Sequence, residues 1–257
     1  MKHKASLWIS IFALIISLSS LLFALQIIKT SHTKNLHESI LHVAAQQPEK
    51  LMEAIKLGME KKEQEKRKAA LSKLLNKKDS IFNSTTPYFI GNPKGSVIFI
   101  EFLDYNCGFC KRAHEIAKEV IKNHPEVKIL LKEFPILGES SELSAKVALA
   151  SAKQGKYKEV HKALILNQRP LRTIQDVKTF AHSLELNVDQ LLADMNDPSL
   201  EKILQENVEL ALSLGIQGTP GFISKNNVFP GMISKDQFAK LVREELRKHK
   251  IEKSQKN

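Results

Sequence analysis

The feature that most constrains this chain is a Cys-x-x-Cys tetrapeptide, Cys107 to Cys110, which holds both of its 2 cysteines. Two cysteines cannot form a disulfide scaffold, nor supply a four-cysteine zinc or iron–sulfur site within one chain. The pair is therefore a metal half-site, a structural pair or a redox pair. No histidine lies at finger-like spacing with a second cysteine, so we expect no metal and no cofactor.

The segments beside the cysteines predict a strand–turn–helix arrangement. Residues 97–103 are almost continuously apolar, as in a buried central strand, and 107–123 have helical spacing. A second strand is expected at 127–134, which makes a βαβ unit. At a helix N-terminus, free N–H groups and the helix dipole favour a thiolate, which lowers the pKa of Cys107. Cys110, one turn further in, keeps a higher pKa, so this position favours the redox pair.

The rest of the chain is rich in predicted helix, in keeping with its 10 glycines and 9 prolines. Residues 83–94 are expected to form a loop. Three further elements are expected: a helical region at 140–214 with breaks at 167–173 and 196–199, a hairpin at 221–224 and 228–229, and a last helix at 234–249.

The first 30 residues predict a membrane or export segment. A basic leader, residues 1–4, precedes an uncharged apolar run at 5–28 that Lys29 ends. At about 1.5 Å per residue this run is long enough to cross about 30 Å of hydrocarbon. We favour an uncleaved anchor over a cleaved signal peptide, with the rest of the chain outside the cytoplasm. A Cys-x-x-Cys pair can be oxidised in such a compartment.

Residues 31–84 are expected to form a helical stalk. Within them, residues 33–79 lack Cys, Trp, Tyr and Phe but carry an apolar stripe with helical spacing. The stripe comprises Leu36, Ile40, Val43, Leu51, Ile55, Met59, Leu71, Leu74 and Leu75. The segment is either an amphipathic linker or an element that buries its stripe against another copy, and we favour self-association.

The formal net charge of +11 admits nucleic-acid or anionic membrane partners. Basic residues are mixed with acidic ones through most of the chain, and residues 251–257 form a short basic tail. No basic stretch interleaves aromatic residues as base-stacking surfaces do, so we expect no nucleic-acid partner.

Two segments resemble a known family. The stretch from Ile98 to Cys110, with Phe-Ile-Glu-Phe-Leu-Asp-Tyr-Asn-Cys-Gly-Phe-Cys, resembles the active-site segment of DsbA-type thioredoxin-fold proteins. Gly-Ile-Gln-Gly-Thr-Pro-Gly-Phe at 215–222 resembles the loop that carries the family's cis-proline. The resemblance covers about 87–248 and implies an α/β thioredoxin fold with a helical insertion, in a catalytic domain at 85–250. The stalk resembles the N-terminal extension of exported, oligomeric members.

The resemblance assigns roles to individual residues. Cys107 matches the nucleophile that forms a mixed disulfide, and Cys110 matches the resolving thiol. Glu101 matches the buried acid that shuttles the proton of Cys110, and its apolar strand agrees with this role. Pro220 matches the cis-proline, and the backbone of Thr219 would pair with an extended substrate. Taken alone, Glu101 could instead be a solvated carboxylate at a strand edge, and Thr219-Pro220 an ordinary turn.

Two departures concern the type of activity. Gly108-Phe109 replaces the Pro-His dipeptide of strongly oxidising DsbA and is closer to the Gly-Tyr of disulfide isomerases; we include both residues in the substrate-binding site. Thr219 before the proline also resembles isomerases. His114, one turn beyond Cys110, is expected to be a solvated helix residue.

We therefore expect an exported enzyme that forms or isomerises disulfides, with isomerase or mixed activity favoured over pure oxidase. The expected partners are unfolded or misoxidised exported proteins, a membrane redox partner of the DsbB or DsbD type, and further copies of the chain in a homodimer or homotrimer. The alternative is a non-enzymatic surface antigen or binding module on a thioredoxin fold.

Overall fold

The structure, a computed structural model, describes residues 26, 38–42, 44–76, 81–82 and 88–254. Its residues divide by their contacts into two compact units, Met1–Glu63 and Gln64–Asn257. The described part of the first unit is mainly helical and includes the start of α2 (Pro48–Asn76). Apolar side chains of this part, such as Met52 and Met59, are exposed.

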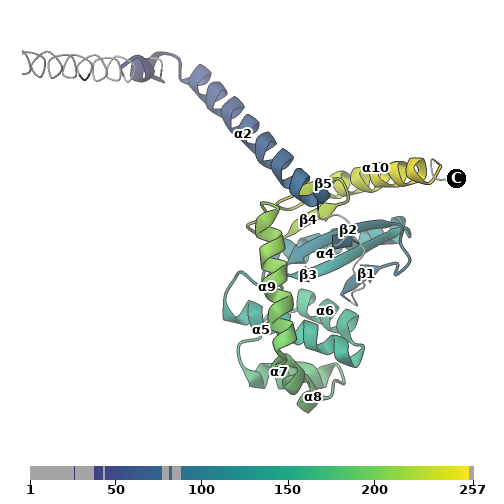
Figure 1. Ribbon diagram of the computed structural model, residues 1–257. Helices are drawn as coiled ribbons and strands as arrows, with labels where there is room; N and C mark the ends of the chain where they lie inside the picture. Colours follow the sequence, from purple (N-terminus) through teal and green to yellow (C-terminus); the bar gives the residue numbers. More distant parts are fainter. Residues whose placement is uncertain (1–25, 27–37, 43, 77–80, 83–87, 255–257) are drawn as a thin grey trace, which may run out of the picture. The chain divides into compact units, whose positions relative to one another are not determined.

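The second unit is built on a five-stranded sheet of order β1-β3-β2-β4-β5 (Figure 1). The strands are β1 (Phe89–Gly91), β2 (Val97–Leu103), β3 (Val127–Glu133), β4 (Gly221–Ser224) and β5 (Asn227–Phe229). The β2–β3 pair is parallel and the other pairs are antiparallel. The chain passes from β2 to β3 through α4 (Gly108–Asn123), which confirms the predicted βαβ unit.

Alternation along the strands places buried side chains in two cores, one on each face of the sheet. The α4 core contains Phe99, Leu103 and Leu131 with side chains of α4 and of α10 (Lys235–Ser254). The α2 core contains Ile100, Phe102, Leu130 and Ile223. The βαβ unit therefore has a hydrophobic layer on each side, as its near-continuous apolar strands require.

The end of α2 belongs to this second unit. Ala70 and Leu74 are buried in the α2 core together with Ile81 and Phe82, and Leu74 has no exposed surface. The domain core therefore begins earlier than the predicted boundary at residue 85. Residues 83–94, expected to be a loop, contain β1, which pairs with β3.

Five helices lie between β3 and β4 and form the helical insertion. They are α5 (Glu139–Ser151), α6 (Tyr157–Leu166), α7 (Ile174–Ser183), α8 (Val188–Met195) and α9 (Pro198–Ser213), with a short 3₁₀ helix, η1 (Ala152–Gln154), after α5. Both predicted breaks are present. Two more occur near Gly155 and Glu185, each with a positive φ.

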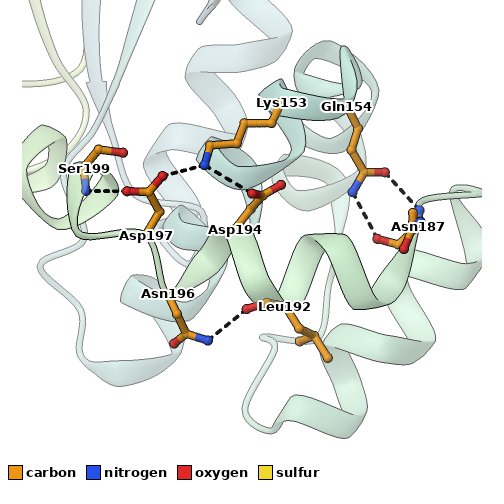
Figure 2. Close-up of polar contacts among 8 residues, drawn as sticks. All are labelled: Lys153, Gln154, Asn187, Leu192, Asp194, Asn196, Asp197 and Ser199. Atoms are coloured by element: carbon orange, nitrogen blue, oxygen red, sulfur yellow. Dashed lines mark hydrogen bonds and ion pairs between the residues drawn. The ribbon is translucent and has the colours of Figure 1, made fainter.

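Polar side chains join η1 to the region around α8 (Figure 2). Lys153 Nζ lies 3.2 Å from Asp194 Oδ1 and 2.5 Å from Asp197 Oδ2. The Gln154 side chain makes two hydrogen bonds, of 3.0 and 2.9 Å, with the backbone of Asn187. These contacts fix the insertion where its helices are interrupted.

The predicted apolar segment at 5–28 lies outside the described residues except for Gln26. Among the residues that the structure describes, no helix is long and apolar enough to cross a membrane. The hairpin and the last helix are confirmed, and α10 continues past residue 249 into the predicted basic tail.

Candidate active site around the cysteine pair

The turn between β2 and α4 presents the first cysteine at a helix start. Cys107 is the N-cap of α4, with extended backbone at φ −78° and ψ 117°. The Asp104 carboxylate accepts hydrogen bonds from the backbone N–H of Asn106 at 2.8 Å and of Ile136 and Leu137 at 2.9 and 3.0 Å. One buried side chain thus holds both the turn before Cys107 and the loop that follows β3.

The two thiols lie in different environments. Both are free, and Cys107 is 7% exposed whereas Cys110 is fully buried. A hydrogen bond with Cys110 lowers the pKa of Cys107 to about 5, with further help from Thr219 and from backbone N–H groups at the start of α4. The hydrogen bond with Cys107, together with burial, raises the pKa of Cys110 well above its ordinary value. A pKa of about 5 favours the ionised form of Cys107 at neutral pH.

The loop before β4 brings a proline to the cysteines. The Thr219–Pro220 peptide bond is cis, as the resemblance implies, and Cys107 Sγ lies 3.2 Å from the Thr219 carbonyl oxygen. Only the protonated form of Cys107 can donate a hydrogen bond to this oxygen. A Cβ atom at Gly221 would lie 2.4 Å from Ile216 Cγ2, so the close approach of the loop requires glycine there. Residues 112 positions apart in sequence thereby share one site.

Glu101 lies on β2, between β3 and β4, and is 3% exposed. This burial excludes the alternative of a solvated carboxylate at a strand edge. Desolvation, together with the negative charge of Cys107, raises the pKa of Glu101 to about 8. The carboxyl group can therefore hold or release a proton near neutral pH.

The dipeptide between the cysteines faces solvent. Gly108 is exposed, and Phe109 is 54% exposed with the Arg112 guanidinium 4.4 Å from its ring centre. Two more apolar side chains, Ile136 and Leu137, are exposed on the loop whose amides bind Asp104. Phe109 thus offers an exposed apolar ring two residues after Cys107, and Ile136 and Leu137 lie on a loop that Asp104 joins to the turn before Cys107.

His114 is a correction to the sequence prediction. The prediction places it in solvent, but it is 5% exposed, with its ring 5.3 Å from that of His161 on α6. Burial lowers its pKa. The error arises because α6, which covers this side of α4, comes from the insertion and has no local signal in α4.

Sequence reasoning also missed buried polar residues near the site. Asp104 holds the turn, and Glu133 at the end of β3 accepts a hydrogen bond from the Tyr157 hydroxyl at 2.6 Å. A carboxylate in a mainly apolar strand was the available signal for Glu133, as it was for Glu101. Among the described residues, no group of three or more His, Cys, Asp or Glu side chains could hold a metal ion.

Two solved structures with related chemistry in their names match this chain. A thioredoxin-like oxidoreductase from Silicibacter pomeroyi is 34% identical, with TM-score 0.62, covering 66% of this chain and 97% of its own. The thiol-disulfide exchange protein α-DsbA2 from Wolbachia pipientis is 29% identical, with TM-score 0.62 and coverage of 69% and 96%.

A periplasmic thioredoxin-like protein from Salmonella enterica serovar Typhimurium is 25% identical, with TM-score 0.57 and coverage of 68% and 97%. Curated relatives match over a shorter region. A Na(+)/H(+) antiporter NhaA 3 from Salinispora tropica is 25% identical over 134 residues, 51% of this chain, and the match spans only 20% of that relative's length.

The family model of the DSBA-like thioredoxin domain matches residues 98–243, more than half of the chain. The matched segment begins on β2 and includes both cysteines, the cis-proline loop and the whole helical insertion. Because sequence match, fold and site geometry agree, this chain belongs to the DSBA-like thioredoxin domain family, whose homologues are thiol–disulfide oxidoreductases.

Proposed function

We propose that this protein catalyses thiol–disulfide exchange on exported proteins, with isomerase activity favoured over pure oxidase activity. The observation that carries the proposal is the pair of unequal thiols at the start of α4, with Cys107 Sγ 3.2 Å from the carbonyl oxygen before a cis-proline. A surface binding module would need neither an ionised thiol nor a second, protonated thiol beside it.

In the proposed exchange, the Cys107 thiolate attacks one sulfur of a substrate disulfide. A mixed disulfide forms, and the other substrate sulfur leaves as a thiolate that takes up a proton. In isomerisation, a second substrate thiolate then attacks the mixed disulfide and restores the Cys107 thiolate, so no net electrons move. In reduction, Cys110 loses its proton and attacks Cys107, which releases the second substrate thiol and leaves a Cys107–Cys110 disulfide.

We assign Glu101 to the proton of Cys110. The Cys110 thiol is buried and strongly favours its protonated form, so the attack by Cys110 needs a base inside the protein. Glu101 is a buried carboxyl whose negative charge acts on Cys110, and its pKa of about 8 leaves part of it ionised at neutral pH.

We assign substrate binding to the surface beside Cys107. The backbone of Thr219 would pair with an extended peptide, and Gly108 leaves space for it because nothing lies within 4 Å of a Cβ built there. Phe109, Ile136 and Leu137 offer exposed apolar side chains, which suit unfolded chains with exposed hydrophobic residues.

We place the protein outside the cytoplasm, anchored by residues 5–28 or released by cleavage of that segment, with a membrane redox partner of the DsbB or DsbD type. A periplasmic relative supports the location. We propose a homodimer or homotrimer through residues 33–79, because Ile40, Ile55 and Met59 are exposed along the stalk.

The test is refolding of a scrambled multi-disulfide substrate together with reduction of insulin. The full exported portion should do both, and a variant lacking residues 30–63 should lose isomerase activity and become a monomer by light scattering. The deletion ends before Ala70 because the end of α2 is part of the core. A Cys107→Ser protein as active as the wild type would refute the enzyme assignment, and a monomeric wild type at about 50 μM would refute the stalk assignment.

A further inference from the structure

A second buried carboxyl lies on the same sheet face as Glu101. In the parallel β2–β3 register, Leu103 is opposite Glu133 and Glu101 is opposite Leu131, so alternation places both carboxyls on the α4 side. Glu133 is 1% exposed. Its Oε1 accepts from Tyr157 at 2.6 Å and lies 3.4 Å from the Tyr105 hydroxyl, whereas Oε2 has no partner among the described residues.

Glu133 is connected to the segment that presents Cys107. Tyr105, whose hydroxyl contacts Glu133, lies two residues before Cys107, in the turn that Asp104 holds. The Tyr105 hydroxyl is also 3.1 Å from His161 Nδ1. In addition to burial, negative charge at Glu133 on β3 and at Glu101 on β2 raises the pKa of Tyr105, so Tyr105 is the common neighbour of both carboxyl groups.

Several elements contribute titratable groups around Glu133. Tyr88, Tyr105 and Tyr157 interact with Glu133 itself. Glu101 and His161 act on Tyr105, and His114 acts on His161. On its own strand, Lys132 favours the ionised carboxylate, but its amine donates to Asn207 Oδ1 on α9. Burial lowers the pKa of His161 to about 3, so that ring is neutral. No other charged side chain contacts the Glu133 carboxyl among the described residues.

We propose that Glu133 is a positioning residue of the redox pair, which acts through Tyr105 on the turn before Cys107 and tunes the reduction potential by its charge. The inference rests on the proposed thiol–disulfide exchange. When Glu133 is ionised, Tyr105 donates to it and accepts from His161. When Glu133 is protonated, Tyr105 is free to donate instead to His161 Nδ1, in the tautomer of the neutral ring that carries its proton on Nε2. The network therefore has two hydrogen-bond arrangements that differ by one proton.

The sign of the effect follows from the charge. An ionised Glu133 disfavours the Cys107 thiolate, which destabilises the reduced pair relative to the disulfide. Burial raises the pKa of Glu133 to about 7, so this effect is absent well below pH 7 and complete well above it. A neutral side chain at this position should make the disulfide more oxidising, and only at the higher pH.

The experiment is equilibration of the purified full exported portion with reduced and oxidised glutathione from pH 5.5 to 8.5. In this equilibrium the reduced protein and one oxidised glutathione are converted to the protein disulfide and two reduced glutathiones, so two electrons are transferred. For Glu133→Gln we expect the same equilibrium constant as wild type at pH 5.5. At pH 8.5 we expect it to shift about tenfold towards the reduced protein, equivalent to about 30 mV. Glu126→Gln, which removes an exposed carboxylate just before β3, is the matched control and should follow wild type.

A second variant tests the inference if Glu133→Gln does not fold. Tyr157→Phe keeps the carboxyl but removes its donor at 2.6 Å, which raises the pKa of Glu133 and should move the bend in the potential–pH curve to higher pH. A shift in Glu133→Gln that is equal at every pH, or an unmoved bend in Tyr157→Phe, would overturn the inference. A wild type that does not exchange with glutathione at all would overturn the proposed function and this inference with it.

Discussion

The two faces of the β2–β3 pair carry the same strands but different chemistry. On the face of the α4 core, Glu101 and Glu133 are buried beside the turn that bears the cysteines. On the face of the α2 core, Ile100, Phe102 and Leu130 pack with the end of α2. Burying a carboxyl group destabilises the folded state, whereas packing apolar side chains together stabilises it. Changes on the first face should therefore alter chemistry more than stability, and changes on the second face should do the reverse.

The largest effect is expected at the cysteines. Cys107→Ser should abolish turnover because it removes the thiolate, whereas Cys110→Ser should accumulate mixed disulfides with substrates because only a substrate thiol is left to resolve them. Alkylation of the reduced protein at pH 6, followed by peptide mapping, should label Cys107, since its pKa of about 5 leaves it ionised there. Preferential labelling of Cys110 would reverse the two assignments.

The α2 core should respond in stability rather than chemistry. Leu74 is fully buried, so Leu74→Ala should lower the free energy of unfolding by about 2–5 kcal/mol while the rate of exchange in the folded protein stays near wild type. Leu75, one residue on, is 49% exposed, and Leu75→Ala should change stability by less than about 0.5 kcal/mol. Chemical denaturation measures both, and equal effects would contradict the burial of α2 in this core.

Glu101→Gln should slow resolution of the mixed disulfide by about 10²-fold, a typical contribution of a general base. In wild type the rate should rise with pH up to about 8 as Glu101 ionises, and the variant should lack this rise. Stopped-flow release of a labelled thiol measures both rates. The same pH dependence in both proteins would show that Glu101 is not the base.

The raised pKa of Glu101 also has a consequence for stability. Between about pH 4.5 and 8 the folded protein keeps a proton that the unfolded chain releases, so this group lowers stability as pH rises through that window. Glu101→Gln should therefore be more stable relative to wild type at pH 8 than at pH 4.5.

Much of the fold and the centre of the site could be predicted from local sequence patterns. Apolar runs give β2 and β3 because buried parallel strands need apolar side chains on both faces. Cys107 and Pro220 were found from motifs, since each motif is short and continuous. The burial of His114 and the hydrogen bonding of Glu133 depend on α6, a helix of the insertion that contacts both residues. The sequences of α4 and β3 do not show that α6 packs against them.

The smallest effect is expected where the site meets its substrate. Phe109 is 54% exposed beside Cys107, and partial burial of such a ring against a peptide is worth about 1 kcal/mol. Phe109→Ala should therefore raise KM for a scrambled protein about fivefold. Exchange with glutathione, which makes no extended apolar contact, should keep its wild-type rate. Ile174→Ala, which removes a similarly exposed apolar side chain at the start of α7, is the control and should leave both unchanged. If Phe109→Ala slowed both reactions equally, the ring would support the helix start rather than bind substrate.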